Sequence, residues 1–399
     1  MLVPDIVLSL SLVVFVLAWF RRSLSRRELL LRTVLIIAIL AAIWGLTIDR
    51  WQTGFGGLGA IILMLIVLFR RTPRTAQPGV PYVSGTLFAL GAAAAITIIY
   101  MFPIQHLPQP SGSNAVGVST FELRDESRPG IFLAKPDAPR RLLVRAWYPA
   151  NPESRSKPEH YFNDLEARST ARGFGELLGF PPLLTYIQHV KTHSYENAPP
   201  VKTGSRFKSV IFSHGYGSFP QQNTALMEHL ASHGYVVFAI QHTYDSSATA
   251  FPNGDIAPMD PGFVTDNLGE TPQRFSYSDE VGDRWTARLK MQQNYQDEGL
   301  RFTQSSAPVW LDDQRFVVDR LQSGTVPDHV AELVTHSDLN RVAVIGMSFG
   351  GSTAGAFCLQ DERCVAGINM DGLDIHFRAT NQKMNAPFLM LHTDLNGFG

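Results

Sequence analysis

The pentapeptide GMSFG places Ser348 between Gly346 and Gly350, in a setting that suits nucleophilic chemistry. The apolar run Arg341–Ile345 before it predicts a strand, and Phe349–Leu359 after it predicts a helix. Such an abrupt turn strains the serine backbone and exposes the hydroxyl, and the two glycines leave room for it. The helix dipole favours negative charge nearby. We therefore expect Ser348 to act as a nucleophile in covalent catalysis.

A second loop offers hydrogen-bond donors for the oxyanion that this nucleophile would create. The apolar run Ser209–Phe212 predicts a strand, and the sequence SHGYG follows it. The glycines let this loop fold back, so the backbone N–H of Tyr216 is expected to pair with the N–H of Phe349 as oxyanion donors. His214 is expected to be a hydrogen-bonded structural residue rather than the base, because the base of such sites usually lies nearer the C-terminus.

Three aspartates are candidates for the acid that orients a catalytic base. Asp371 directly follows the predicted strand Val365–Met370, Asp374 lies three residues further on, and Asp394 follows the predicted strand Phe388–His392. Spacing alone does not choose among them, because in such folds the acid follows either of two late strands. Each is equally well read as an ordinary solvated loop residue.

Short β-rich and helical segments alternate from about Thr120 onward. The remaining predicted elements are strands at Leu142–Tyr148 and Val236–Ile240, and helices at Asn223–Ser232 and from a cap at Asp312 or Asp313 to Gln322. Apolar strands separated by helices favour a mostly parallel sheet with helices on both faces. The motifs fall at the carboxyl ends of its strands. The expected fold class is α/β, with the α/β-hydrolase fold.

The N-terminal third contains four apolar runs that are long enough, or nearly so, to cross a bilayer as helices. They are Ile6–Phe20, Leu29–Ile48, Phe55–Phe69 and Val83–Phe102. Arginines crowd the first and third loops between them, and positive loops stay in the cytoplasm. We therefore expect an integral, multi-pass membrane protein whose catalytic domain is extracytoplasmic.

The chain is expected to have three parts: a transmembrane helical region at 1–103, a linker rich in Pro, Gly and Ser at 104–118, and an α/β-hydrolase domain at 119–399. The formal net charge of -1 argues against nucleic-acid binding. Neither a metal-site spacing of Cys and His nor a phosphate-binding glycine loop is found. We expect no metal and no cofactor, and the lipid bilayer as a partner.

Two long stretches, Ser213–Ser247 and Val344–Asp371, resemble the platelet-activating-factor acetylhydrolases of the plasma (isoform II) type. The segments Trp147–Ala150 (WYPA) and Trp310–Asp313 (WLDD) support the resemblance, which covers roughly Thr120 to the end. It implies a calcium-independent serine esterase. Such an enzyme removes short or oxidised acyl chains from the sn-2 position of phospholipids, and relatives accept other small esters.

The resemblance also assigns roles by position. Ser348 matches the nucleophile, Asp371 the triad acid, and Tyr216 with Phe349 the oxyanion donors. This favours Asp371 over Asp394.

This chain departs from the family pattern at the catalytic histidine. In the family this residue lies some tens of residues beyond the acid, whereas this chain stops at Gly399. The two histidines after Ser348 are His376 and His392, and neither sits in the family's context. We therefore expect a fragment that is truncated at the C-terminus, with the triad histidine beyond Gly399.

The expected function is that of a membrane-anchored serine carboxylic-ester hydrolase. It would release short or oxidised acyl chains from phospholipids or similar small esters through an acyl-serine intermediate. One alternative is a general esterase or polyester hydrolase of the same fold. Another is a catalytically silent membrane binding protein, which the missing histidine favours and the serine motif opposes.

Two further features have open interpretations. The long irregular region Phe251–Ala307 either covers the cleft and shapes acyl selectivity or is a surface excursion. Cys358 and Cys364 flank the turn after the helix that follows Ser348. Outside the cytoplasm they would form a disulfide, and otherwise they would be small buried residues.

Overall fold

The chain forms two compact units. In the computed structural model, residues 1–21, 26–69, 80–130, 138–179, 183–260, 262, 297, 301–372, 384 and 386–392 are described. The first unit consists of Met1–His106 together with Thr185–Val190, and the second of Leu107–Leu184 together with Lys191–Gly399.

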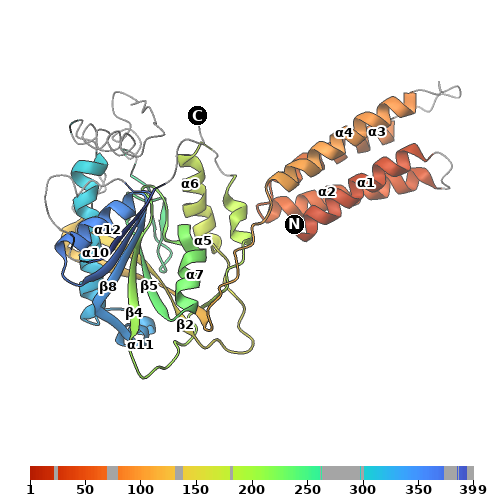
Figure 1. Ribbon diagram of the computed structural model, residues 1–399. Coiled ribbons are helices and arrows are strands. Elements are labelled where there is room, and N and C mark those ends of the chain that lie inside the picture. Colours follow the sequence, from red (N-terminus) through yellow and green to blue (C-terminus); the bar gives the residue numbers. More distant parts are fainter. Residues whose placement is uncertain are drawn as a thin grey trace, which may run out of the picture. The chain divides into compact units, whose positions relative to one another are not determined.

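The first unit contains four apolar helices (Figure 1). They are α1 (Val3–Phe20), α2 (Arg27–Thr47), α3 (Gln52–Phe69) and α4 (Val80–Met101). All four are long and apolar enough to cross a membrane. Each begins two or three residues before the apolar run that predicted it.

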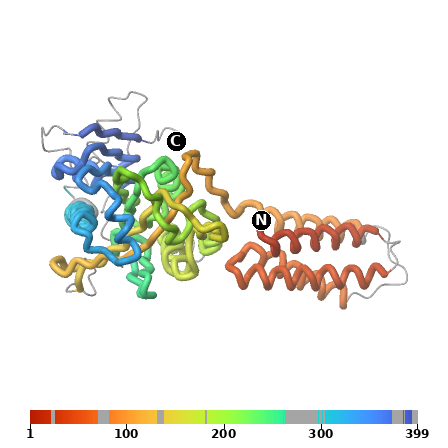
Figure 2. The backbone as a smooth tube through the Cα atoms, turned by 90° about the horizontal axis from the view of Figure 1, so that it is seen from below, coloured from red at the N-terminus to blue at the C-terminus, as the bar shows by residue number. Residues whose placement is uncertain are grey.

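The interior of this helical unit combines small residues with large apolar ones such as Phe15 and Leu35, and further large apolar residues cover its outside. Figure 2 shows its helices running side by side. A Cβ added at Gly57 would lie only 2.4 Å from the Cβ of Ala42, so α3 and α2 approach closely there. Leu10, Leu40 and Leu58 are exposed on the outer surface. This arrangement is typical of helices that pack together in lipid, where small residues let backbones approach.

A buried ion pair links the helix ends at one end of this unit. Arg50, between α2 and α3, donates through Nη2 to Oδ2 of Asp5 at 2.9 Å, and both side chains are fully buried. Its Nη1 donates to the carbonyl of Phe102, just after α4, at 3.0 Å. Because Asp5 lies in the first turn of α1, the arginine joins segments of all four helices.

The second unit is built on an eight-stranded sheet with the order β10-β9-β8-β4-β5-β2-β1-β3. The strands are β1 (Ala115–Pro129), β2 (Pro139–Ala150), β3 (Ser194–Glu196), β4 (Phe207–Ser213), β5 (Tyr235–Gln241), β8 (Ser337–Met347), β9 (Cys364–Met370) and β10 (Phe388–Leu391). Strand β2 is antiparallel to β1 and β5, and the other strand pairs are parallel. A separate small hairpin joins β6 (Thr249–Ala250) and β7 (Ile256–Ala257).

Helices cover both faces of this sheet, as Figure 1 shows. One face packs on α10 (Ala307–Gln322), α11 (Asp328–Thr335) and α12 (Phe349–Gln360), and the other on α7 (Thr224–Ser232). Short elements of this unit are α5 (Asp164–Glu166), α6 (Arg172–Leu177), η1 (Ala167–Ala171), η3 (Pro220–Asn223) and η4 (Phe302–Ser306), whereas η2 (Thr185–His189) belongs to the first unit. A mostly parallel sheet between helices confirms the predicted α/β class and α/β-hydrolase fold.

Two predictions about element boundaries differ from the structure. Strand β1 begins at Ala115, inside the predicted linker, and it was not expected from the sequence. It carries charged residues on its exposed half, so its apolar pattern is weak. Helix α10 begins at Ala307, so Asp312 and Asp313 lie within it and cap nothing. The prediction of a cap there was wrong.

Candidate active site

Ser348 lies at the turn between β8 and α12. Its backbone has φ 52° and ψ -121°, a left-handed conformation that a residue with a side chain adopts only under strain. Its side chain is exposed to solvent, whereas the neighbouring Phe349 is buried. The structure thus presents this hydroxyl outward at a strained strand-to-helix turn, the geometry expected of a nucleophile.

The flanking glycines are required by close backbone contacts. A Cβ on Gly346 would lie 2.0 Å from the carbonyl carbon of Gly350. A Cβ on Gly350 would lie 2.1 Å from the carbonyl oxygen of Ser213, at the end of the neighbouring strand β4. No side chain fits at either position without a shift of the backbone, so the turn depends on both glycines.

The predicted oxyanion loop follows β4 and lies beside the serine. A Cβ added at Gly215 would be 3.5 Å from the Cβ of Ser348. The N–H of Gly215 donates to Oε1 of Gln222 at 2.8 Å, which holds the loop folded back. The rings of Tyr216 and Phe349 pack with centroids 4.9 Å apart, so the two predicted donor residues are neighbours. Their role as donors of backbone N–H groups stays a prediction.

Asp371 follows β9 next to the serine turn. The N–H of Ser348 donates to the carbonyl of Met370 at 2.7 Å, and the N–H of Asp371 donates to the carbonyl of Leu391 at 2.6 Å. Asp371 has a positive φ of 61°, and a Cβ on the next residue, Gly372, would lie 2.1 Å from the carbonyl oxygen of Ser348. The backbone at the predicted acid therefore contacts the backbone at the predicted nucleophile.

Of the other candidate acids and bases near the C-terminus, only His392 is among the described residues. Asp374, Asp394 and His376 lie outside the described residues. His392 directly follows β10 and is exposed. The identity of the catalytic base stays a prediction.

His214 is fully buried and hydrogen-bonded on both sides of its ring. Its Nδ1 lies 2.7 Å from the carbonyl oxygen of Gly215, and its Nε2 accepts from the N–H of His242 at 3.3 Å. Burial, reinforced by the nearby His242, lowers the pKa of His214 from 6.5 to about 3. The ring is therefore neutral at physiological pH, with its proton on Nδ1, as a structural histidine requires.

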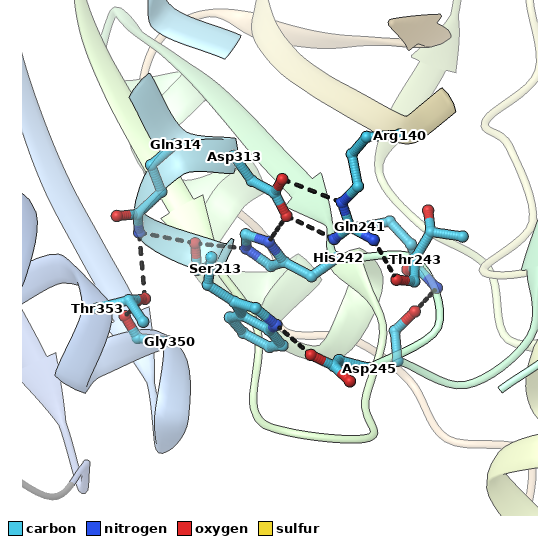
Figure 3. A network of polar contacts seen from close by, with 12 residues as sticks. Arg140, Ser213, Gln241, His242, Thr243, Asp245, Asp313, Gln314, Gly350 and Thr353 are labelled. Carbon is cyan, nitrogen blue, oxygen red and sulfur yellow. Dashed lines mark hydrogen bonds and ion pairs between the residues drawn. The ribbon is translucent and has the colours of Figure 1, made fainter. Parts of the chain in front are cut away.

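A second Ser-His-Asp arrangement, which the sequence analysis missed, lies beside this loop (Figure 3). Nε2 of His242 is 3.0 Å from Oγ of Ser213, and its Nδ1 is 2.9 Å from Oδ2 of Asp313. Oδ2 of Asp313 also accepts from Nη2 of Arg140 at 2.6 Å, and Oγ of Ser213 from Nε2 of Gln314 at 2.9 Å. We call these five residues the Ser213 network.

The charges of the Ser213 network are fixed by its surroundings. Burial alone would raise the pKa of Asp313, but the Arg140 guanidinium overrides it and holds that pKa well below its usual range. Burial lowers the pKa of His242, although Asp313 opposes the shift. His242 is therefore neutral, its Nδ1 donates to Asp313, and its Nε2 accepts from the Ser213 hydroxyl.

This arrangement has triad hydrogen bonds but no access to an ester. Ser213, His242 and Asp313 are all 0% exposed. Ser213 belongs to strand β4 and is not among the residues with positive φ. Ser213 therefore has the partners of a nucleophile without the exposure of one.

A signal for His242 was present in the sequence. His242 directly follows β5, Ser213 ends β4, and these two strands are parallel neighbours. The carboxyl ends of adjacent parallel strands lie at the same edge of a sheet, so their terminal residues were candidates for contact. Asp313 gave no such signal, because it lies in the middle of a helix.

The structure also bears on the cysteine pair, the long irregular region, a cavity and the possibility of a metal site in this unit. Cys358, near the end of α12, is joined by a disulfide to Cys364, which begins β9. Most of the region Phe251–Ala307 lies outside the described residues. A cavity of about 400 Å³ is lined by Arg145, Glu159 and neighbouring residues, and it includes none of the predicted site residues. Among the residues that the structure describes, no group of three His, Cys, Asp or Glu could hold a metal ion.

Known proteins resemble this chain in sequence and structure. The curated acetylhydrolase "Platelet-activating factor acetylhydrolase" of Cavia porcellus is 31% identical over 249 residues, which cover 59% of this chain and 52% of that protein. The protein of the same name from Canis lupus familiaris is 26% identical over 290 residues, 71% of this chain and 57% of the relative. The chain therefore spans about half the length of the curated relatives it matches.

A solved structure of a ferulic acid esterase from Streptomyces cinnamoneus superposes with a TM-score of 0.51 and 27% sequence identity, covering 73% of this chain and 68% of that one. Residues 100–301 match the model of the family described as "Platelet-activating factor acetylhydrolase, isoform II". This segment is about half of the chain and includes the loop at Tyr216 and the histidine at 242. The chain belongs to the platelet-activating factor acetylhydrolase, isoform II family.

Proposed function

We propose that the protein is a membrane-anchored serine hydrolase that releases short or oxidised acyl chains from phospholipids or similar small esters. The observation that carries the proposal is the strained, exposed backbone of Ser348, at φ 52° and ψ -121° between β8 and α12. Membership of the acetylhydrolase family supports the substrate class. Two relatives named platelet-activating factor acetylhydrolase support it further.

The proposed reaction follows the acyl-serine pathway. The Ser348 oxygen attacks the ester carbonyl carbon while a histidine base takes the hydroxyl proton. The carbonyl oxygen becomes an oxyanion, and the N–H groups of Tyr216 and Phe349 donate to it. The bond to the leaving alcohol then breaks, and the alcohol departs with the proton from the base. Water attacks the acyl-serine in the same way and restores the free serine.

Asp371 is the proposed acid that orients the base and stabilises its protonated form. Its backbone lies against the serine turn, through Met370 and Gly372. The family resemblance predicts a histidine as the base, and the position of that histidine stays a prediction. An aspartate in this role remains ionised and fixes the tautomer of the histidine.

The four helices are proposed to anchor the hydrolase in a bilayer, with the catalytic unit on the extracytoplasmic side. Their length and hydropathy support spanning, and the arginines in the first and third loops of the sequence support the orientation. The Cys358–Cys364 disulfide supports the same side, because disulfides persist in oxidising compartments.

The test uses protein expressed from its complete reading frame and reconstituted in detergent. Hydrolysis of p-nitrophenyl acetate and labelling by a fluorophosphonate probe are measured for the parent and for Ser348→Ala. We expect both to be lost in the variant, at least about a thousandfold for hydrolysis. A variant that hydrolyses the ester at the parent rate would end the proposal. A parent protein that the probe never labels would favour the silent binding protein instead.

A general esterase is the second candidate, and one observation favours it. The solved structure with the TM-score of 0.51 is titled a ferulic acid esterase, so a related fold acts on an aromatic ester. Rates on a phospholipid with an sn-2 acetyl group, on its long-chain counterpart and on methyl ferulate separate the two candidates. A preference for acetyl phospholipid supports the first function, and a preference for the ferulate ester supports the second.

A further inference from the structure

Gln314 connects the two segments that carry the predicted oxyanion donors. Its Nε2 donates to Oγ of Ser213 at 2.9 Å and lies 3.3 Å from Oγ1 of Thr353 (Figure 3). Thr353 Oγ1 donates in turn to the carbonyl of Gly350 at 3.0 Å. Ser213 ends β4, where the oxyanion loop begins, and Gly350 lies in the first turn of α12. One buried amide group therefore bridges the two segments.

The network is anchored on its other side in β2 and α10. Asp313 accepts from Nε and Nη2 of Arg140 at 3.1 and 2.6 Å, and from Nδ1 of His242 at 2.9 Å. Nη1 of Arg140 donates to the carbonyl of Thr243 at 2.6 Å. All of these side-chain groups are buried, and a buried charge that loses its partner is strongly destabilising. The arrangement from Arg140 to Ser213 is therefore held in one geometry.

His242 also supports the loop directly. The backbone N–H of His242 donates to Nε2 of the His214 ring, and Nδ1 of that ring is hydrogen-bonded to the carbonyl of Gly215. The His242 ring stacks on Trp310 with centroids 3.8 Å apart and planes 9° apart. Trp310 packs edge to face on Phe349 at 4.8 Å. His242 thus contacts the loop directly and, through Trp310, reaches Phe349, the first residue of α12.

We propose that the Ser213 network positions the Tyr216 and Phe349 amides for the oxyanion, and that its members act through these amides without touching the substrate. The inference rests on the proposed function of Ser348. Oxyanion donors help only if they are in place before the reaction, because donors that must reorganise lose their advantage. A displacement of about 1 Å at a reacting group can cost about a hundredfold in rate.

The experiment measures kcat and KM on p-nitrophenyl acetate for Gln314→Leu, Thr353→Val and the double variant, in protein from the complete reading frame. Each single variant is expected to lower kcat about tenfold, with KM unchanged within about twofold. The double variant is expected to be no slower than the slower single one, because both changes cut the same link. Rates are normalised to the folded fraction found by thermal unfolding.

The matched control is Val317→Ala. Val317 lies on the same helix as Gln314, is fully buried, and takes no part in the network. Its truncation leaves a cavity and should lower the melting temperature without lowering kcat. If Gln314→Leu does not fold, Ser213→Ala replaces it, because that change removes the hydroxyl that accepts from Gln314 and donates to His242.

The outcomes separate the inference from the function on which it rests. A parent-like kcat in Gln314→Leu overturns the positioning role. Additive losses in the double variant overturn it too, as does an equal kcat loss in Val317→Ala. If Ser348→Ala is inactive while the network variants keep full kcat, only the positioning role fails. If Ser348→Ala hydrolyses the ester at the parent rate, the proposed function itself fails.

Discussion

Two serines lie at the carboxyl ends of the neighbouring parallel strands β4 and β8: Ser213 ends β4, and Ser348 directly follows β8. Ser213 is in register with Gly346, two residues before Ser348. Ser213 has a neutral histidine and an ionised aspartate in hydrogen-bonded sequence, yet it is wholly buried in regular strand. Ser348 is exposed at a strained turn. Hydrogen-bond partners alone therefore do not expose a hydroxyl, whereas the strained turn at Ser348 does, and for this reason Ser348 is the proposed nucleophile.

The largest expected difference between these two regions is in labelling by a fluorophosphonate. Ser213→Ala should keep labelling, with a rate reduced about tenfold, because the hydroxyl that labels is at Ser348. Ser348→Ala should abolish it. Mass spectrometry of the labelled peptide locates the adduct. An adduct on Ser213 would reverse the comparison.

Gly350 is the point at which the two regions touch, and its replacement should be the next most harmful change. In Gly350→Ala the new Cβ would lie 2.1 Å from the Ser213 carbonyl oxygen and 2.5 Å from that of His214. Overpacking of a rigid backbone contact costs about 1–3 kcal/mol or more, and it displaces the turn. We expect loss of hydrolysis and a lowered melting temperature. Gly204→Ala, where a Cβ meets nothing within 4 Å, is the control and should match the parent.

Acidification should destabilise the folded protein through the buried His214. His214 has a pKa of about 3 in the folded protein against 6.5 ordinarily, because burial disfavours its charged form. Since the folded pKa is the lower one, this contribution to stability is complete above pH 6.5 and is lost as the pH falls toward 3. At about 1.4 kcal/mol per pKa unit, the loss over this range of about 3.5 units reaches about 5 kcal/mol.

The measurement compares melting temperatures of the parent and His214→Gln from pH 7.5 to pH 4.5. The parent should lose stability more steeply, because its unfolded state gains a proton that the folded state does not take up. Parallel curves for the two proteins would contradict the assigned neutral state of His214.

The disulfide should give the smallest effect. It joins the end of α12 to the start of β9, the strand that Asp371 follows. Closing so short a loop stabilises by about 2 kcal/mol in the chain-entropy model. The Cys358→Ala, Cys364→Ala double variant should therefore melt a few degrees lower and still label at Ser348. If labelling is lost while the protein stays folded, the disulfide itself shapes the serine turn.

The sequence predicted the parts of the site that depend on local structure. Ser348 and its glycines follow from a strand, a turn and a helix that are adjacent in the chain, and the four apolar helices follow from composition. Asp313, which pairs with His242, and Arg140, which pairs with Asp313, could not be found in that way. Asp313 and Arg140 lie 71 and about a hundred residues from His242, so only the assembled sheet brings them together. Strand β1 was concealed for a related reason, because its polar half is held in the sheet by backbone pairing with β2 rather than by an apolar pattern of its own.

The buried pair of Asp5 and Arg50 has a consequence for biogenesis. If the helices span a bilayer, each charge is a costly lone ion until α1 and the connection between α2 and α3 have both emerged on the same side. A chain inserted with one hairpin inverted would leave both ions uncompensated. In a bilayer, pairing of the two charges would therefore favour the arrangement in which both of these segments lie on the same side.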